Sequence, residues 1–166
     1  MNVFRSGLAL DTMLAAIAAA ARAPLAARPG AIADAMAPFL RDPLLLEGRD
    51  CPANPERYVR HLLGEGEGYA VVALVWRPMQ MSPVHAHRTW CAFGVHRGIL
   101  TEHHYEPATL RPNGAFLRCE GDTCHGPADP MLIHRLANCS AEVATSIHAY
   151  GAAFERMGEQ VNLVLG

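Results

Sequence analysis

From residue 69 onward, the sequence is a series of short apolar segments separated by glycine and proline. The first segment, Tyr69–Trp76, is an unbroken run of β-branched, aromatic and small apolar residues. Such runs between turn-forming residues predict β-strands. Further candidate strands follow at 84–95, 98–106, 114–120, 131–136, 142–150 and 160–166. Because no helical pattern separates these segments, we expect an antiparallel barrel or jelly roll and not a parallel α/β sheet.

The N-terminal part of the chain has a helical composition. Residues 11–46 are rich in alanine, leucine and methionine, and Asp11 is expected to be the N-cap of the first helix. Pro38 is expected to kink or shorten the second helix. The basic Arg5 and the apolar run after it also fit a signal peptide, but the charge of Asp11 within that run favours a soluble helix.

Length and composition favour one globular domain. The chain has 166 residues, of which 51% are hydrophobic and 18% are charged. A mainly β protein is expected, with a helical segment at 1–50 and a barrel at 55–166. The basic residues, which are all arginines, are dispersed and the formal net charge is −2, which argues against nucleic-acid binding. No apolar run is long enough to span a membrane. Because the chain also lacks a basic patch, a small-molecule partner is expected.

The cysteines indicate the cellular compartment. Five cysteines form an odd set without regular spacing, which predicts free thiols and a reducing, cytoplasmic location. The composition is compatible with a monomer or a homo-oligomer.

Histidines in two of the candidate strands suggest a metal site. The residue numbers of His85, His87 and Cys91 differ by two and four, so in one strand the three side chains would share a face. Imidazole is the commonest metal ligand, but a hydrogen-bonded structural pair explains the same pattern equally well. His134 is a third candidate from another apolar segment. Three such ligands would leave coordination positions open for substrate and dioxygen.

A second polar row lies in the segment 142–150. Ser146, His148 and Tyr150 alternate at period two, so they would face one side of a strand and form a hydrogen-bonded relay. The alternative is the outward polar face of an edge strand. A serine-hydrolase triad is a poor interpretation, because no acid orients the histidine and no nucleophile elbow surrounds the serine.

Four motifs occur in an order that points to a known family: YVRHLL, SPVHAHRTWCAFGVHRG, IHRLAN and SIHAY, between Tyr58 and Tyr150. On these residues the sequence resembles the cupin-fold thiol dioxygenases of the cysteine dioxygenase family. The resemblance implies a cupin double-stranded β-helix in which His85, His87 and His134 hold one iron(II). Three neutral ligands leave the metal its full positive charge, which favours a bound thiolate over a thiol of pKa about 8.5.

The resemblance also implies roles for residues around the metal. Ser146, His148 and Tyr150 match the family's relay, whose phenol lies close to iron and substrate. Arg60 matches the arginine that binds the substrate carboxylate, and Tyr58 lies on the same side. A guanidinium suits a carboxylate because its donors form a planar fork, although a solvated surface arginine is the alternative.

The substrate implied by the resemblance is L-cysteine, which would be oxidised with dioxygen to cysteine sulfinate. Family members that act on 3-mercaptopropionate share Thr89, Trp90 and Gly151 with this chain but usually have glutamine at the position of Arg60. Because the arginine contacts the carboxylate directly, cysteine is the expected substrate and 3-mercaptopropionate, or another small thiol carboxylate, is the alternative. A non-catalytic ligand-binding cupin and a metal-dependent isomerase are the competing classes.

Cys91 is the remaining departure from the family pattern. Animal cysteine dioxygenases carry a nearby cysteine that forms a thioether with the active-site tyrosine, whereas many bacterial members have glycine. The spacing before Cys91 is one residue shorter than in the animal enzymes. Both a Cys91–Tyr150 thioether and a buried unmodified thiol are therefore expectations to be tested.

Overall fold

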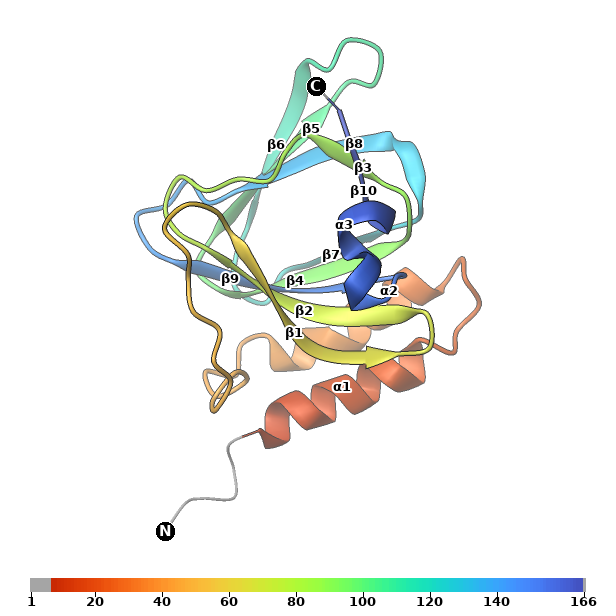
Figure 1. Ribbon diagram of the computed structural model, residues 1–166, viewed down its shortest axis with the longest axis vertical. Coiled ribbons are helices and arrows are strands. Elements are labelled where there is room, and N and C mark those ends of the chain that lie inside the picture. Colours follow the sequence, from red (N-terminus) through yellow and green to blue (C-terminus); the bar gives the residue numbers. More distant parts are fainter. Residues whose placement is uncertain (1–6, 166) are drawn as a thin grey trace.

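The computed structural model describes residues 7–165, and its strands form two antiparallel sheets that close into a barrel (Figure 1). The strands are β1 (Val59–Gly66), β2 (Tyr69–Trp76), β3 (His85–His87), β4 (Cys91–Arg97), β5 (Leu100–Tyr105), β6 (Pro112–Arg118), β7 (Thr123–Gly126), β8 (Asp129–Ala137), β9 (Ala144–Tyr150) and β10 (Asn162–Val164). The first sheet has the order β1-β2-β9-β4-β7, and the second has the order β10-β3-β8-β5-β6. The expected antiparallel barrel is confirmed.

Helices cover the outer face of the first sheet, as Figure 1 shows for α1 (Leu8–Ala20) and α2 (Arg28–Met36). The turn η1 (Ala37–Phe39) contains Pro38, so the proline shortens the second α-helix as expected. The predicted N-cap is wrong: Gly7 caps α1 at φ 96°, and the Asp11 amide already donates to the Gly7 carbonyl at 2.9 Å. Glycine adopts this left-handed conformation without the steric cost that aspartate would meet.

The first sheet is buried on both faces. All residues of β2 and β9 are buried, because α1 and α2 pack against one face and the barrel interior lies on the other. Double burial explains why Tyr69–Trp76 is continuously apolar and shows no alternation. On β4, a Cβ added to Gly94 would collide with Cδ1 of Leu40, so this glycine lets the segment after η1 approach the sheet.

The strand expected at 84–95 is instead two strands in different sheets. His85–His87 belongs to the second sheet and Cys91–Arg97 to the first, and residues 88–90 cross between them. Cys91 therefore does not share a strand face with the two histidines. Strands β1 and β7 were not predicted, because both segments contain polar residues and glycine that weaken a strand pattern.

The C-terminal segment returns to the barrel. A short turn η2 (Phe154–Arg156) and α3 (Met157–Gln160) lead into β10, which pairs with β3 and places Asn162 opposite His87. Among the helices of residues 7–165, none is long and apolar enough to cross a membrane.

Candidate metal centre

Three histidines converge on one point inside the barrel. β3 carries His85 and His87, and the antiparallel register places His134 of β8 directly opposite His85. The nitrogen atoms that could bind a metal all lie within 4.8 Å of one another, and the two Nε2 atoms of His87 and His134 are 2.8 Å apart. Within residues 7–165 this is the group of three side chains with metal-binding spacing.

Hydrogen bonds fix the ring nitrogens that face the centre. The Nδ1–H of His85 donates to the Pro83 carbonyl at 2.9 Å, and the Nδ1–H of His134 donates to a carboxylate oxygen of Glu102 at 2.8 Å. In the neutral rings each Nε2 then presents a lone pair. Burial, followed by the nearby His134, lowers the pKa of His85 to about 4 and that of His87 to about 2. Both rings are therefore neutral and able to ligate.

The donor set fits a first-row divalent metal. Nε2 of His134 is an acceptor, so His87 must donate its only hydrogen across the 2.8 Å contact, and its buried Nδ1 then has no partner. A metal ion would be bound by both Nε2 atoms and would replace the hydrogen bond between them. Imidazole ligands suit iron, zinc, copper and nickel, and three protein ligands leave positions open for other molecules.

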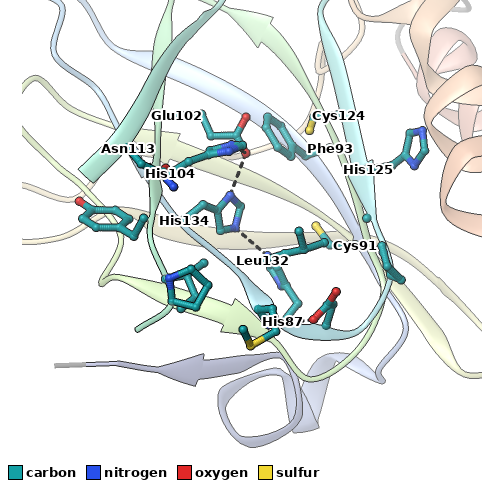
Figure 2. A pocket seen from close by; sticks show the side chains of 17 residues that line it. His87, Cys91, Phe93, Glu102, His104, Asn113, Cys124, His125, Leu132 and His134 are labelled. Carbon is teal, nitrogen blue, oxygen red and sulfur yellow. Dashed lines mark hydrogen bonds and ion pairs between the residues drawn. The ribbon is translucent and has the colours of Figure 1, made fainter. Parts of the chain in front are cut away.

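Glu102 orients His134 from outside this group. Its carboxylate lies on β5 and accepts from His134 (Figure 2). It also receives the Nε–H of Arg118 at 2.8 Å. Burial alone would raise the pKa of Glu102, but the bonds from His134 and Arg118 lower it to about 2. The sequence analysis did not assign Glu102 or Arg118. The available signal was an acidic residue two positions from Leu100, at an inward position of a predicted strand.

The row on β9 faces the barrel interior. Ser146 Oγ lies 2.8 Å from Nε2 of His148, and the Tyr150 hydroxyl lies 2.9 Å from Nδ1 of the same ring. All three side chains are buried, and β9 lies between β2 and β4. An outward polar face on an edge strand is therefore excluded for this row, and the relay geometry is present.

Trp76 extends this relay, and the histidine within it is neutral. Trp76, another residue that the sequence analysis gave no role, donates its Nε1–H to Ser146 at 3.0 Å. Burial, followed by the charge of Arg60, lowers the pKa of His148 well below its usual value, so the ring is neutral. The neutral ring donates through one nitrogen and accepts through the other, so the relay is complete either with Ser146 donating to His148 and His148 to Tyr150, or with both bonds reversed.

Cys91 lies next to Tyr150. The two residues are directly opposite each other in the β4–β9 ladder, and both side chains are buried. Burial, followed by the neighbouring Cys124, raises the pKa of the Cys91 thiol well above its usual value. Burial and Cys91 likewise raise the pKa of Tyr150. Both groups are therefore protonated near neutral pH.

Arg60 and Tyr58 lie beside the histidines, around a cavity of about 20 Å³ that we call the arginine cavity. His85, His87, His134 and Tyr150 also line it. The Nε of Arg60 is buried and has no hydrogen-bond partner. Tyr58 stacks on Trp76 with a centroid separation of 4.3 Å.

Asn162 adds an unassigned polar group to the arginine cavity. Its Oδ1 is buried without a partner, like the Nε of Arg60. An unpaired donor and an unpaired acceptor at one cavity are costly unless a ligand satisfies them.

Comparisons with known proteins establish the fold. No protein-family model matches the chain. A protein of Thermus thermophilus is 19% identical with a TM-score of 0.52, over 61% of this chain and 90% of its own. A Klebsiella pneumoniae protein with a double-stranded β-helix domain is 16% identical with a TM-score of 0.51, over 65% of this chain and 93% of its own. A Desulfitobacterium hafniense cupin-superfamily protein is 9% identical with a TM-score of 0.49, over 62% of this chain and 84% of its own.

At these identities the likeness concerns the fold and not the reaction. The chain has the double-stranded β-helix fold of cupins, which confirms the fold that the sequence resemblance implied. The cysteine dioxygenase family is not identified by these matches.

Proposed function

We propose that the protein is an iron(II)-dependent thiol dioxygenase that oxidises L-cysteine to cysteine sulfinate. The observation that supports this most strongly is that one cavity holds the three histidines, Arg60 and Tyr150. A bound iron(II) would favour the thiolate form of the substrate and would pass electrons from its sulfur to dioxygen. The alternative substrate is 3-mercaptopropionate or another small thiol carboxylate.

The protein side chains would bind and orient the substrate. Arg60 would donate to the carboxylate, since its buried Nε lacks any other partner. With Ser146 as donor to His148 and His148 as donor to Tyr150, the Tyr150 O–H would be free to donate a hydrogen bond to substrate oxygen or sulfur. Oδ1 of Asn162 would accept from an ammonium group, which favours cysteine over 3-mercaptopropionate.

Two other classes would also place histidines in a barrel. A ligand-binding cupin or a metal-dependent isomerase requires neither an unpaired buried arginine nor a Ser146-His148-Tyr150 relay. These two features are the reason why we favour the dioxygenase.

The experiment that tests the proposal measures oxygen uptake and sulfinate formation by the iron-loaded protein. L-cysteine and 3-mercaptopropionate are compared side by side, with the metal-free protein as control. The proposal predicts one sulfinate formed for each dioxygen consumed with at least one of the two thiols. Absence of uptake with both thiols would reject it.

Thr89, Trp90 and Gly151, which the chain shares with family members that act on 3-mercaptopropionate, have a packing role that does not involve the substrate. Thr89 donates to the Gly151 carbonyl at 2.9 Å, and a Cβ on residue 151 would collide with both Thr89 Oγ1 and Trp90 Nε1. The three residues therefore need one another for packing. Their presence carries less weight on substrate choice than Arg60, which lines the cavity.

Replacing Arg60 with glutamine should shift the choice of substrate. Glutamine retains a donor but loses the charge and the planar fork, so the KM for L-cysteine should rise by roughly one to two orders of magnitude, as expected for loss of a charge-assisted hydrogen bond. The KM for 3-mercaptopropionate should change less. The measurement is steady-state kinetics with both thiols. An unchanged ratio of kcat/KM values would show that Arg60 does not set the choice between the two thiols, and unchanged KM values for both would remove it from carboxylate binding.

We infer that Cys91 and Tyr150 form a thioether in the iron-loaded enzyme after exposure to dioxygen. The cross-strand pairing and the burial of both side chains support this. A new C–S bond would form with transfer of two hydrogen atoms to dioxygen. Intact-mass spectrometry should show a loss of two hydrogens in the wild type and no loss in Cys91→Ser, with turnover reduced severalfold in the variant. A wild-type mass equal to the unmodified chain, or equal turnover in the variant, would contradict the inference.

A further inference from the structure

A second and larger cavity reaches the three-histidine group from a side that Arg60 does not line. This outer cavity has a volume of about 350 Å³ and lies between β4, β5, β7 and β8 (Figure 2). His87, Cys91, Phe93 and His134 line both this cavity and the arginine cavity, so the two spaces meet at the metal-binding side chains. A molecule held at the histidines would therefore have access to both.

The walls of the outer cavity are largely apolar. Phe93 and Ile133 are buried at its surface, and Leu132 extends across it from β8. Cδ1 of Leu132 lies 3.8 Å from the position that a Cβ on Gly126 of β7 would occupy, so the absence of a side chain at residue 126 leaves space beneath the leucine. Apolar walls and a volume of this size are typical of small-molecule sites.

The two carboxylates at this cavity are already hydrogen-bonded. Glu102 is paired with Arg118 and His134, and Oδ1 of Asp129 accepts the amide hydrogen of Met131 at 2.8 Å. Neither acid is left as an unsatisfied partner for a cationic ligand. His104 also lines the cavity, and its buried Nε2 lies 3.3 Å from Glu102 without a hydrogen-bond partner, so the outer cavity favours an uncharged group that is mainly apolar.

A three-carbon thiol acid would leave the outer cavity without an occupant. With its sulfur at the histidines and its carboxylate at Arg60, such a molecule spans only the arginine cavity. The largest space next to the metal group would then take no part in the reaction. A substituent on the carbon next to the carboxylate has access to that space where the two cavities meet.

We propose that the outer cavity binds an apolar substituent of the substrate, so that the enzyme oxidises 3-mercapto acids with a large apolar group next to the carboxylate. This rests on the proposed thiol dioxygenase activity. The reaction is R–SH + O2 → R–SO2H, in which both oxygen atoms bond to sulfur. Sulfur loses four electrons and dioxygen gains them. The sulfinic acid product ionises to a sulfinate and a proton.

The first test measures binding and does not depend on turnover. Isothermal titration compares 3-hydroxypropionate with 2-benzyl-3-hydroxypropionate, in which a hydroxyl replaces the oxidisable thiol. The benzyl compound should bind at least about tenfold more tightly, because its ring leaves water for an apolar cavity. Equal affinities would overturn the proposal.

Leu132→Trp provides the variant, because Leu132 is 51% exposed and a larger side chain there should fill the cavity without unfolding the barrel. The matched control is Leu117→Trp, at a residue that is 68% exposed and does not line the cavity. The benzyl advantage should fall to less than about threefold in the first variant and persist in the second. Loss in both variants, or in neither, would contradict the assignment, and thermal melts of both establish that each is folded.

Turnover separates the proposed dioxygenase activity from the proposed role of the outer cavity. The wild type should oxidise 2-benzyl-3-mercaptopropionate with a kcat/KM at least equal to that for 3-mercaptopropionate, and Leu132→Trp should lower only the former, by about tenfold. If neither thiol is oxidised, the proposed dioxygenase activity fails while the binding result stands. If only the small thiol is oxidised, the dioxygenase proposal stands and the inference about the outer cavity fails.

Discussion

Replacing His87 with alanine is expected to abolish stable iron binding and thiol oxidation together. Its Nε2 lies 2.8 Å from that of His134, and the loss of the ring leaves two of the three nitrogens. Loss of a residue that only hydrogen-bonds to a metal ligand already lowers metal affinity or activity by roughly 10- to 100-fold, so loss of a ligand itself should have a larger effect. Iron per protein, measured by plasma mass spectrometry, and sulfinate formation should both fall below a hundredth of the wild-type value.

His103→Ala is the matched control for this variant. His103 lies on β5 and lines neither the arginine cavity nor the outer cavity, whereas the next residue, His104, lines the outer cavity. The control should retain iron and activity within about twofold, as expected for a substitution away from the site. A His87→Ala protein that keeps its iron and its turnover would show that the three histidines are not the metal centre.

Replacing Glu102 with glutamine is the second change with a large expected effect. The amide can no longer neutralise Arg118, and it can turn its NH2 group toward Nδ1 of His134, which removes the acceptor that sets the tautomer of this ligand. Iron affinity should fall by about 10- to 100-fold. Competition with a chromophoric chelator measures this directly.

The exposed Glu159 provides the matched control as Glu159→Gln, for which no change in iron affinity is expected. Addition of excess iron should restore much of the activity of Glu102→Gln, because the three ligands are still present. An iron affinity equal to that of the wild type would show that Glu102 does not orient His134. A thermal melt is needed for this variant, since Arg118 loses its charged partner.

The regular parts of the fold were predictable because their local signals were strong. The segment Tyr69–Trp76 corresponds to β2 without a change of boundary, and 142–150 contains β9, because buried strands flanked by turn residues are locally consistent. The strand expected at 84–95 was wrong, because nothing local shows that the chain crosses to the other sheet at 88–90. Asp11 was expected as N-cap on propensity, but the helix begins earlier, with Gly7 as its N-cap.

The candidate site was predictable where short motifs carry it and not where long-range register does. His85 and His87 lie one residue apart in the sequence, but their approach to His134 depends on the pairing of β3 with β8. Glu102 was missed because its partners lie on other strands, and Asn162 was missed because only the pairing of β10 with β3 brings it to the cavity. The row of Ser146, His148 and Tyr150 was found because period-two spacing is visible in the sequence.

The central claim is that both atoms of one dioxygen molecule are transferred to the sulfur of a thiol carboxylate. Turnover of the iron-loaded protein with L-cysteine under ¹⁸O2 in ordinary water, followed by mass spectrometry of the product, tests this directly. The predicted product is cysteine sulfinate that carries two ¹⁸O atoms. Disulfide without sulfinate, sulfinate with oxygen from water, or unchanged cysteine would contradict it.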